Sequence, residues 1–273
     1  MDATREMLPE ALRGTPASEL VLLLDCDGVL APIVDDPAAA AVPASTVALV
    51  RTAIERCALV GVVTGRGIER ARELVPVEGA WFAALHGVLI VSPDGVEDAD
   101  AVSAAGREHV ALAAQLAQTV GWAYEDKGGS VTIHFRQRGA LGQHVDPAHV
   151  RAQLQTVLNP LKTEIHDAKQ VLEIKPKGAR TKGDAVRVLS AAAPAEARVV
   201  VFVGDDLTDL DAFRAMSAMH DEQAVATAGE TPLTFVKVAV GGDEAPAALV
   251  AEADHVLANE AAVPAFLAAL LDG

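Results

Sequence analysis

Two kinds of hydrophobic pattern alternate along this chain. Runs that are apolar at nearly every position are typical of strands covered by helices on both faces, and stretches with apolar residues at helical spacing separate them. The runs that predict strands are 20–24, 58–63, 80–85, 199–203 and 234–240. The stretches that predict helices are 43–56, 68–74, 181–189, 210–216 and 263–271. This alternation predicts an α/β fold: a Rossmann-like parallel sheet with right-handed crossovers and helices on both faces.

The pattern changes in the middle of the chain. Residues 130–136 alternate between apolar and polar side chains, as a strand with one exposed face does. Around this strand we expect helices at 101–120 and 147–158 and a hairpin of strands at 163–166 and 171–174. We therefore predict an inserted α+β domain at 92–176 and a core domain formed by 1–91 and 177–273.

The composition identifies the chain as globular, since 51% of its 273 residues are hydrophobic and 22% are charged. A formal net charge of -16 argues against a basic surface for nucleic acid. No run reaches the roughly 20 apolar residues that span a bilayer, and no secretory signal is visible. Two cysteines, Cys26 and Cys57, provide no disulfide framework, so we expect a cytoplasmic protein. Nothing indicates the oligomeric state, and a monomer is compatible with the sequence.

Two carboxylates directly follow the first predicted strand. Asp25 and Asp27 are two positions apart, so in an extended chain both side chains point the same way. Gly28 allows a sharp bend after them. Two like charges at the end of a strand are costly unless a cation lies between them. This short motif therefore predicts either a cation site or, taken alone, a solvated turn.

Other polar residues follow buried strands further along the chain. Thr64 follows the second strand, and Asp205 and Asp206 follow a later one. Taken singly, Thr64 could cap a helix, the two aspartates could belong to a capping cluster, and Lys182 could be a solvated lysine. Because open α/β sheets bind ligands at the carboxyl ends of their strands, we expect these residues to share one cleft with the first-strand aspartates.

These residue types suit the transfer of a phosphoryl group. Asp25 can attack phosphorus and form an aspartyl phosphate, and Asp27 can protonate the departing alkoxide and then accept a proton from water. Thr64 can donate its hydroxyl to a phosphoryl oxygen. Lys182 adds a compact positive charge at a helix start, where backbone N–H groups also favour anions.

The same strand ends predict a magnesium site. Asp25 and Asp205 offer the hard oxygen ligands that Mg²⁺ prefers. The backbone carbonyl of Asp27 and water molecules would complete an octahedron. Asp206 would bind the ion directly or through water.

Four short motifs resemble those of haloacid-dehalogenase-type phosphatases. They are DCDGVL at 25–30, TGR at 64–66, KG at 182–183 and GDDLTD at 204–209. Val29 stands where this superfamily more often has Thr. The predicted insert lies between the second and third motifs, as in the α/β-capped sugar phosphatases. The short stretch from Asp27 to Thr64 leaves no room for a cap of the mutase type.

Further runs resemble the trehalose-6-phosphate phosphatase family over nearly the full chain. They are 31–37, 85–87, 134–136, 172–176 and 204–213. Ala31 replaces a Ser that is common in that family. The resemblance implies a Mg²⁺-dependent hydrolase that converts trehalose 6-phosphate to trehalose and phosphate. Its partner would be a small-molecule sugar phosphate selected by the cap, with neither nucleic acid nor membrane involved.

The resemblance also implies a set of substrate-binding residues. They are Gly65, Arg66, His86, Glu125, Lys127, Arg136 and Glu173. Carboxylates and an ammonium group suit sugar hydroxyls because charge-assisted hydrogen bonds are strong. Taken singly, His86 could be a structural loop residue, and the charged cap residues could be solvated.

Three alternatives stay open from the sequence. The same chemistry could act on another phosphorylated disaccharide or pseudo-disaccharide, or on a glycosyl phosphoglycerate, because substrate choice lies in the cap. A binding or regulatory module with a dead active site is disfavoured by the complete motifs. A phosphotransferase or mutase is disfavoured by the position of the cap.

Overall fold

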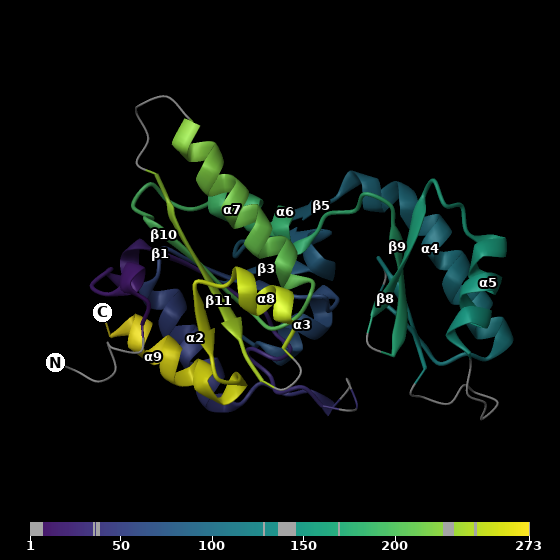
Figure 1. Ribbon diagram of the computed structural model, residues 1–273, viewed down its shortest axis with the longest axis horizontal. Coiled ribbons are helices and arrows are strands. Elements are labelled where there is room, and N and C mark those ends of the chain that lie inside the picture. Colours follow the sequence, from purple (N-terminus) through teal and green to yellow (C-terminus); the bar gives the residue numbers. More distant parts are fainter. Residues whose placement is uncertain are drawn as a thin grey trace. The chain divides into compact units, whose positions relative to one another are not determined.

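The structure is a computed structural model, and it describes residues 8–34, 36, 39–127, 129–135, 146–168, 170–225, 232–242 and 245–272. The chain forms two compact units, the first made of Met1–Glu97 and Thr181–Gly273 and the second of Asp98–Arg180. The predicted fold class is confirmed. A mostly parallel sheet with helices forms the first unit, and a small antiparallel sheet with helices forms the second (Figure 1).

The central sheet has the strand order β12-β11-β10-β1-β2-β3-β4-β5. Its strands are β1 (Leu20–Leu24), β2 (Leu59–Val63), β3 (Trp81–Ala84), β4 (Leu89–Val91), β5 (Glu97–Ala99), β10 (Val199–Gly204), β11 (Thr234–Val240) and β12 (His255–Leu257). The pairs from β12 to β3 are parallel, whereas β3 and β4 are antiparallel. In the middle, Leu24 of β1 lies between Val203 of β10 and Val62 of β2. The ends of these three strands therefore meet at one edge of the sheet.

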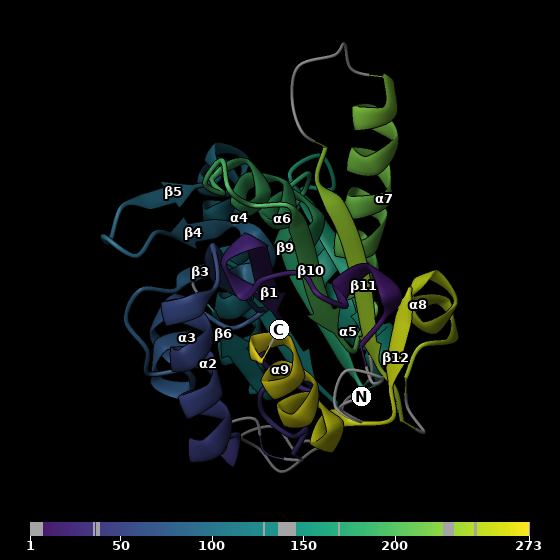
Figure 2. The ribbon, with the colours of Figure 1, turned by 90° about the vertical axis from the view of Figure 1, so that its left-hand side faces the viewer.

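Helices cover both faces of this sheet (Figures 1 and 2). They are α2 (Ala44–Arg56), α3 (Ile68–Leu74), α6 (Lys182–Ala191), α7 (Asp209–Val225), α8 (Ala247–Glu252) and α9 (Val263–Leu271). Neighbouring residues of β1 point to opposite faces. Leu22 belongs to the core that includes Val50 of α2 and Phe266 of α9. Leu23 belongs to the core that includes Phe213 of α7. This two-sided burial explains why β1 is apolar at every position.

The second unit packs two helices on one face of a four-stranded sheet of order β6-β7-β9-β8. Its elements are α4 (Ala101–Val120), β6 (Tyr124–Asp126), β7 (Val131–His134), α5 (Pro147–Val157), β8 (Thr163–Ala168) and β9 (Val171–Pro176). Apolar and polar residues alternate along β7 and β9, so Ile133, Leu172 and Ile174 form the core with the helices. The residues between them lie on the opposite face of the sheet.

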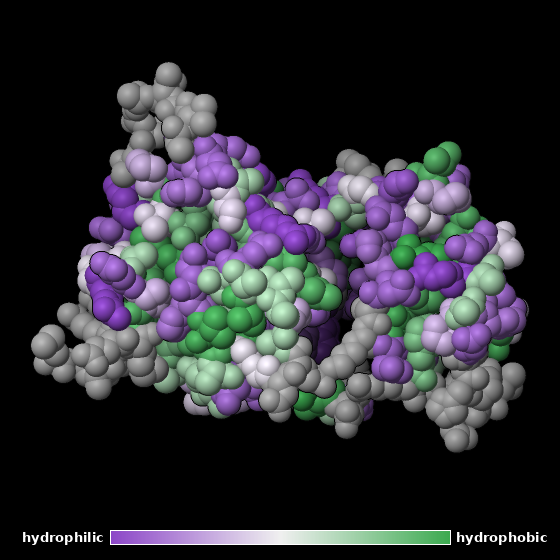
Figure 3. Space-filling view, in the orientation of Figure 1, coloured by the Kyte–Doolittle hydropathy of each residue, from purple (hydrophilic) through white to green (hydrophobic). Residues whose placement is uncertain are grey.

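Some elements differ from the sequence prediction. The helix predicted at 210–216 extends over Asp209–Val225, and β7 is shorter than the predicted strand at 130–136. The prediction omitted α8 and β12 because six and three residues are too few to establish a hydrophobic period. Hydrophilic and hydrophobic residues are interspersed on the face drawn in Figure 3. Within the described ranges, no helix is long and apolar enough to cross a membrane.

Candidate active site

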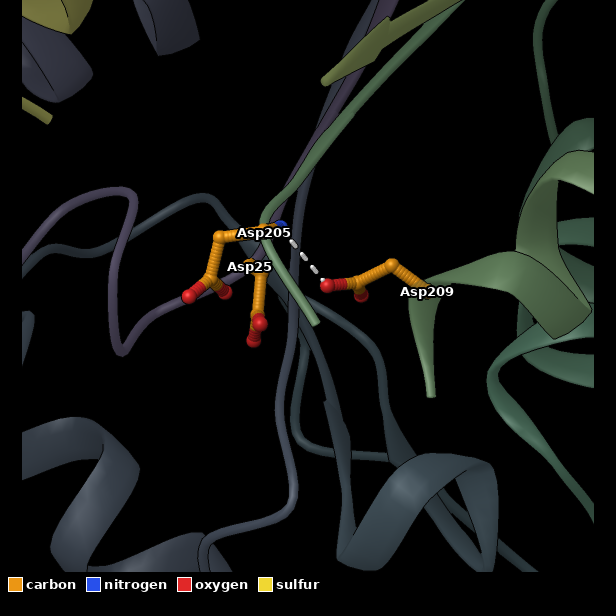
Figure 4. Close-up of side chains that lie close together, drawn as sticks. All are labelled: Asp25, Asp205 and Asp209. Atoms are coloured by element: carbon orange, nitrogen blue, oxygen red, sulfur yellow. Dashed lines mark hydrogen bonds between the residues drawn. The ribbon is translucent and has the colours of Figure 1, made fainter. Parts of the chain in front are cut away.

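Three carboxylates converge at the carboxyl ends of β1 and β10 (Figure 4). Asp25 follows β1, and its backbone N–H donates to the carbonyl of Val203 at 3.0 Å, which continues the pairing of the two strands. Asp205 follows β10, and Asp209 begins α7. One oxygen from each of the three carboxylates lies within 4.8 Å of the others. The parallel register therefore brings together residues 180 positions apart in the chain, as the strand ends predicted.

Lys182 lies between two of these carboxylates. Its ammonium nitrogen is 2.8 Å from Oδ2 of Asp25 and 2.7 Å from Oδ1 of Asp209, and its side chain is only 2% exposed. Thr181 caps the start of α6 by a reciprocal capping box with Asp184, which fixes the first turn of the helix that carries the lysine. The interpretation of Lys182 as a solvated surface lysine is wrong.

The electrostatics of this group are those of crowded, buried charges. Burial and the negative charge of Asp209 raise the pKa of Asp25 well above its usual range, against the opposing effect of Lys182. Burial and the negative charge of Asp209 also raise the pKa of Asp205, to about 7. Burial alone would lower the pKa of Lys182, but the carboxylates of Asp209 and Asp25 outweigh it and raise that pKa. The group holds more negative than positive charge.

Asp209 is a residue of this group that the sequence prediction did not assign to the site. Its Oδ2 accepts hydrogen bonds from the backbone N–H groups of Asp205 and Asp206 at 2.9 Å, while its Oδ1 accepts one from Lys182. It is fully buried. Asp209 therefore shapes the loop after β10 and orients Lys182. Its place as the last acid of the GDDLTD motif was the only signal for it.

Asp27 and Asp206 are not among the three carboxylates whose oxygens lie within 4.8 Å of one another, although the charges of both contribute to the raised pKa of Asp205. Both oxygens of Asp27 accept hydrogen bonds from the guanidinium of Arg66, at 2.8 Å from Nε and 2.6 Å from Nη2. Asp206 is exposed, and its Oδ1 accepts a hydrogen bond from the backbone N–H of Leu207. A direct ligand role for Asp206 therefore has less support than one for Asp25 or Asp205.

The loop after β2 is fastened to the loop after β3. The backbone N–H of His86 donates to the carbonyl of Thr64 at 2.8 Å, and that of Leu85 donates to the carbonyl of Arg66 at 2.9 Å. Leu85 and His86 both have positive φ, an unfavourable conformation for residues with side chains. The imidazole of His86 lies against Gly65, where any side chain would displace it. Thr64 is fully buried, and its hydroxyl oxygen accepts the Arg66 N–H.

The predicted sugar-binding residues of the second unit lie on the face of its sheet opposite the helices. Strand pairing places Glu125 of β6 and Glu173 of β9 on either side of Thr132 of β7. The ammonium of Lys127 is 3.9 Å from Glu173, and the Ser130 hydroxyl donates to the same carboxylate at 3.3 Å. The structure therefore brings three of the predicted residues onto one polar face. Arg136, a fourth, lies outside the described residues.

Known proteins of related sequence and structure match this chain. A family model described as trehalose-phosphatase matches residues 23–241. A Mycobacterium tuberculosis protein named as an uncharacterized glycosyl hydrolase is 31% identical over 79% of this chain and 17% of its own length. The trehalose-phosphate phosphatase of the same organism is 29% identical over 78% of this chain and 56% of its own length. The structure of Aspergillus fumigatus trehalose-6-phosphate phosphatase is 26% identical with a TM-score of 0.61, covering 100% of this chain and 98% of that one. The chain spans about half the length, or less, of these two curated relatives.

Proposed function

Because this chain belongs to the trehalose-phosphatase family, we propose that it is a Mg²⁺-dependent phosphatase that hydrolyses trehalose 6-phosphate to trehalose and phosphate. The observation that carries the proposal is the position of Asp25. Its carboxylate ends the central strand, accepts a charge-assisted hydrogen bond from a buried lysine, and adjoins the carboxylates of Asp205 and Asp209. A nucleophile, a fixed positive charge and hard oxygen ligands are what phosphoryl transfer requires.

The carboxylates fit a magnesium ion on chemical grounds. Three oxygen donors lie within 4.8 Å of one another, and burial with mutual repulsion raises the pKa of Asp25 and of Asp205. A divalent cation would offset this repulsion. Asp25 and Asp205 would hold the ion, since Asp209 is engaged by Lys182 and by two backbone N–H groups. When bound, Mg²⁺ would neutralise charge on the phosphoryl oxygens.

In the first half-reaction, a carboxylate oxygen of Asp25 attacks phosphorus, and the bond from phosphorus to the sugar oxygen breaks. Lys182 favours the anionic form of Asp25, which burial and Asp209 oppose, and a bound cation would favour that form further. Thr64 can donate its hydroxyl to a phosphoryl oxygen while accepting the Arg66 N–H. Asp27 gives its proton to the departing sugar oxygen, which leaves as the neutral hydroxyl of trehalose.

In the second half-reaction, water attacks the phosphorus of the aspartyl phosphate. Asp27 is now a carboxylate and accepts a proton from that water. The bond between phosphorus and the Asp25 oxygen breaks, which returns Asp25 as a carboxylate and releases inorganic phosphate. Asp27 therefore ends the cycle with the proton that it gave away in the first step.

We assign recognition of the sugar part of the substrate to the polar face of the second unit. Glu125, Lys127 and Glu173 offer acceptors and donors for sugar hydroxyls, and strand register keeps them adjacent. Each is partly exposed, so a ligand can reach it. Charged partners make stronger hydrogen bonds with hydroxyls than neutral ones do, which suits selection of a disaccharide.

The proposal is tested by measuring phosphate release from a panel of sugar phosphates with Mg²⁺ and with EDTA. We expect trehalose 6-phosphate to give the highest kcat/KM and EDTA to abolish turnover. Higher kcat/KM on another phosphorylated disaccharide or on a glycosyl phosphoglycerate would reassign the substrate. Isomerised sugar phosphate without phosphate release would identify a mutase.

Replacing Gly28 by Ala is expected to weaken metal binding specifically. Gly28 has a φ of +76°, and a Cβ at this position would collide with the carboxylate of Asp205. We expect the Mg²⁺ concentration for half-maximal activity to rise by about tenfold or more. Gly95→Ala is the matched control, since Gly95 has a similar φ of +83° but open space around it. An equal change in metal dependence for both variants would contradict the prediction.

Replacing Glu173 by Ala is expected to impair sugar recognition and spare the chemistry. Losing hydrogen bonds from a charged group should lower kcat/KM for trehalose 6-phosphate by about 10- to 100-fold. The kcat/KM for 4-nitrophenyl phosphate, which carries no sugar, should change less than about threefold. Asp167→Ala is the control, because strand alternation places exposed Asp167 on the other face of the same sheet. Equal losses on both substrates would argue against a sugar-reading role.

A further inference from the structure

The guanidinium of Arg66 forms a two-pronged contact with Asp27. Nε donates to Oδ2 at 2.8 Å and Nη2 donates to Oδ1 at 2.6 Å, so each carboxylate oxygen receives one N–H. The Arg66 side chain is 14% exposed, and that of Asp27 is 37% exposed. Such bidentate pairs are geometrically specific, because two parallel hydrogen bonds fix the plane of the carboxylate as well as its position.

Backbone hydrogen bonds hold both ends of this pair in place. Arg66 donates its N–H to the Thr64 hydroxyl at 3.1 Å, and its carbonyl accepts from Leu85. On the other side, Gly28 donates to the carbonyl of Ala31 at 2.8 Å, which closes the turn that follows Asp27. The two loops start from the neighbouring strands β1 and β2. Because these hydrogen bonds restrain the backbone on both sides, the Asp27 side chain can still move only by rotation about its own bonds. The hydrogen bonds from the guanidinium of Arg66 restrict that rotation.

We infer that Arg66 is a positioning residue, which orients Asp27 for proton transfer instead of binding the phosphoryl group of the substrate. This rests on the proposed function, in which Asp27 gives a proton to the sugar oxygen and takes one from water. Each oxygen of Asp27 accepts one N–H from Arg66 and keeps a second lone pair. A proton can therefore be exchanged at the outward side of the carboxylate while the contact with Arg66 holds.

The alternative role for Arg66 predicts different kinetics. The contact with Asp27 uses two of the five N–H donors of Arg66, so a guanidinium that binds the phosphoryl group would use other donors. The loss of such a guanidinium would weaken the binding of every phosphate-containing ligand alike. The loss of a guanidinium that positions Asp27 would slow most the reaction steps in which Asp27 transfers a proton. A sugar alkoxide needs a proton to leave, whereas 4-nitrophenolate leaves without one, so only the second half-reaction of the aryl ester depends on Asp27.

The test compares Arg66→Ala and Arg66→Lys with wild type. The measured quantities are kcat on trehalose 6-phosphate and on 4-nitrophenyl phosphate, and the inhibition constant of inorganic phosphate. For Arg66→Ala we expect kcat on the sugar phosphate to fall about 100-fold and kcat on the aryl ester to fall by a clearly smaller factor. The inhibition constant of phosphate should stay within about threefold of wild type. Arg66→Lys should show a smaller loss with the same selectivity for the sugar phosphate. Lysine keeps the positive charge but cannot form two parallel hydrogen bonds with the carboxylate.

Arg187→Ala is the matched control, because Arg187 forms a similar two-pronged pair with Glu222, at 2.8 and 2.9 Å, on exposed surfaces of α6 and α7. Its kinetics should equal those of wild type. Thermal unfolding of each variant verifies the fold, and Arg66→Lys alone suffices for the comparison if Arg66→Ala does not fold.

Three results would overturn the inference: a tenfold or greater rise in the inhibition constant of phosphate, equal losses on the two substrates, or no loss on either. The proposed substrate fails separately. If wild type hydrolyses another sugar phosphate and not trehalose 6-phosphate, the Arg66 comparison is made with that alkyl ester. Wild-type protein that hydrolyses neither an alkyl nor an aryl ester overturns both proposals.

Discussion

Replacing Asp25 by Asn is expected to lower phosphate release by about 10³-fold or more while the protein stays folded. The amide keeps the size of the carboxylate but cannot attack phosphorus. It also keeps an oxygen that can accept the N–H of Cys26, which donates to Oδ1 of Asp25 at 2.7 Å. The measurement is phosphate release at saturating trehalose 6-phosphate and Mg²⁺.

The effect of this substitution on stability separates a chemical role from a structural one. Burial and the charge of Asp209 make the ionised form of Asp25 unfavourable, and they raise its pKa. A neutral amide removes that cost, although Lys182 then has Asp209 as its remaining anionic partner. We therefore expect the Tm in EDTA to stay within about 5 °C of wild type.

Asp221→Asn provides the control for Asp25→Asn, because Asp221 is an exposed aspartate of α7. Its activity and Tm should both match wild type. Residual phosphate release above about a tenth of wild type in Asp25→Asn would refute the assignment of Asp25 as the nucleophile. A collapse of the Tm would instead identify Asp25 as a structural residue.

The meeting of Asp25 and Asp205 could be predicted from the sequence because parallel strands impose it. Both residues follow fully buried strands, and adjacent parallel strands end at the same edge of a sheet. Hydrophobic pattern is enough to identify such strands. The order of the strands and their register then bring the carboxylates together without any further information about side chains.

The contacts of Asp209, Arg66 and Lys182 could not be predicted in the same way. Asp209 accepts hydrogen bonds from two backbone N–H groups, and the guanidinium of Arg66 binds the carboxylate of Asp27. Each contact depends on a side-chain rotamer, and residues from distant parts of the chain determine that rotamer. Neither the amino-acid composition nor the hydrophobic periodicity of the chain predicts side-chain rotamers. Lys182 was placed correctly at a helix start, yet a lysine at such a position is usually solvated. Only the tertiary structure identifies it as buried.

The polar face of the second unit illustrates a further limit. The residues Glu125 and Glu173 could be selected from the sequence by resemblance alone. Their adjacency depends on β7 lying between β6 and β9, with Thr132 opposite both. A shift of one residue in either pairing would turn one carboxylate to the helix-covered face. Hydrophobic alternation predicts which side chains face the core, but not which strands are neighbours.

Replacing Lys182 by Met is expected to cause a large loss of stability as well as of activity. The side chain is 2% exposed, and its ammonium lies within 2.8 Å of both Asp25 and Asp209. Methionine fills a similar volume but leaves two buried carboxylates without their cation. Removing one partner of a buried ion pair typically costs about 3–5 kcal/mol in the free energy of unfolding. Urea unfolding in EDTA at pH 7 measures this loss.

Lys237→Met is the control, because Lys237 is a partly buried lysine of β11 whose ammonium is 3.7 Å from the half-exposed Asp254. Its loss should cost at most about 1 kcal/mol. A loss below about 1 kcal/mol in Lys182→Met as well would contradict the view that Lys182 neutralises the group.

The pH dependence of Lys182→Met should identify the carboxylates as the source of its instability. Burial and like charges already raise the pKa of Asp205 to about 7 and that of Asp25 well above its usual range, even with the lysine present. A carboxyl group with a higher pKa in the folded state than in the unfolded state binds more protons when folded, so stability rises as the pH falls through the folded pKa. Without the lysine both shifts grow, and the variant should regain stability relative to wild type between pH 8 and pH 5. Added Mg²⁺ should also restore part of the loss at pH 7, because the cation that we propose to be held by Asp25 and Asp205 would bind the folded state alone. A deficit that changes with neither pH nor Mg²⁺ would mean that Lys182 stabilises the fold by packing and not by its charge.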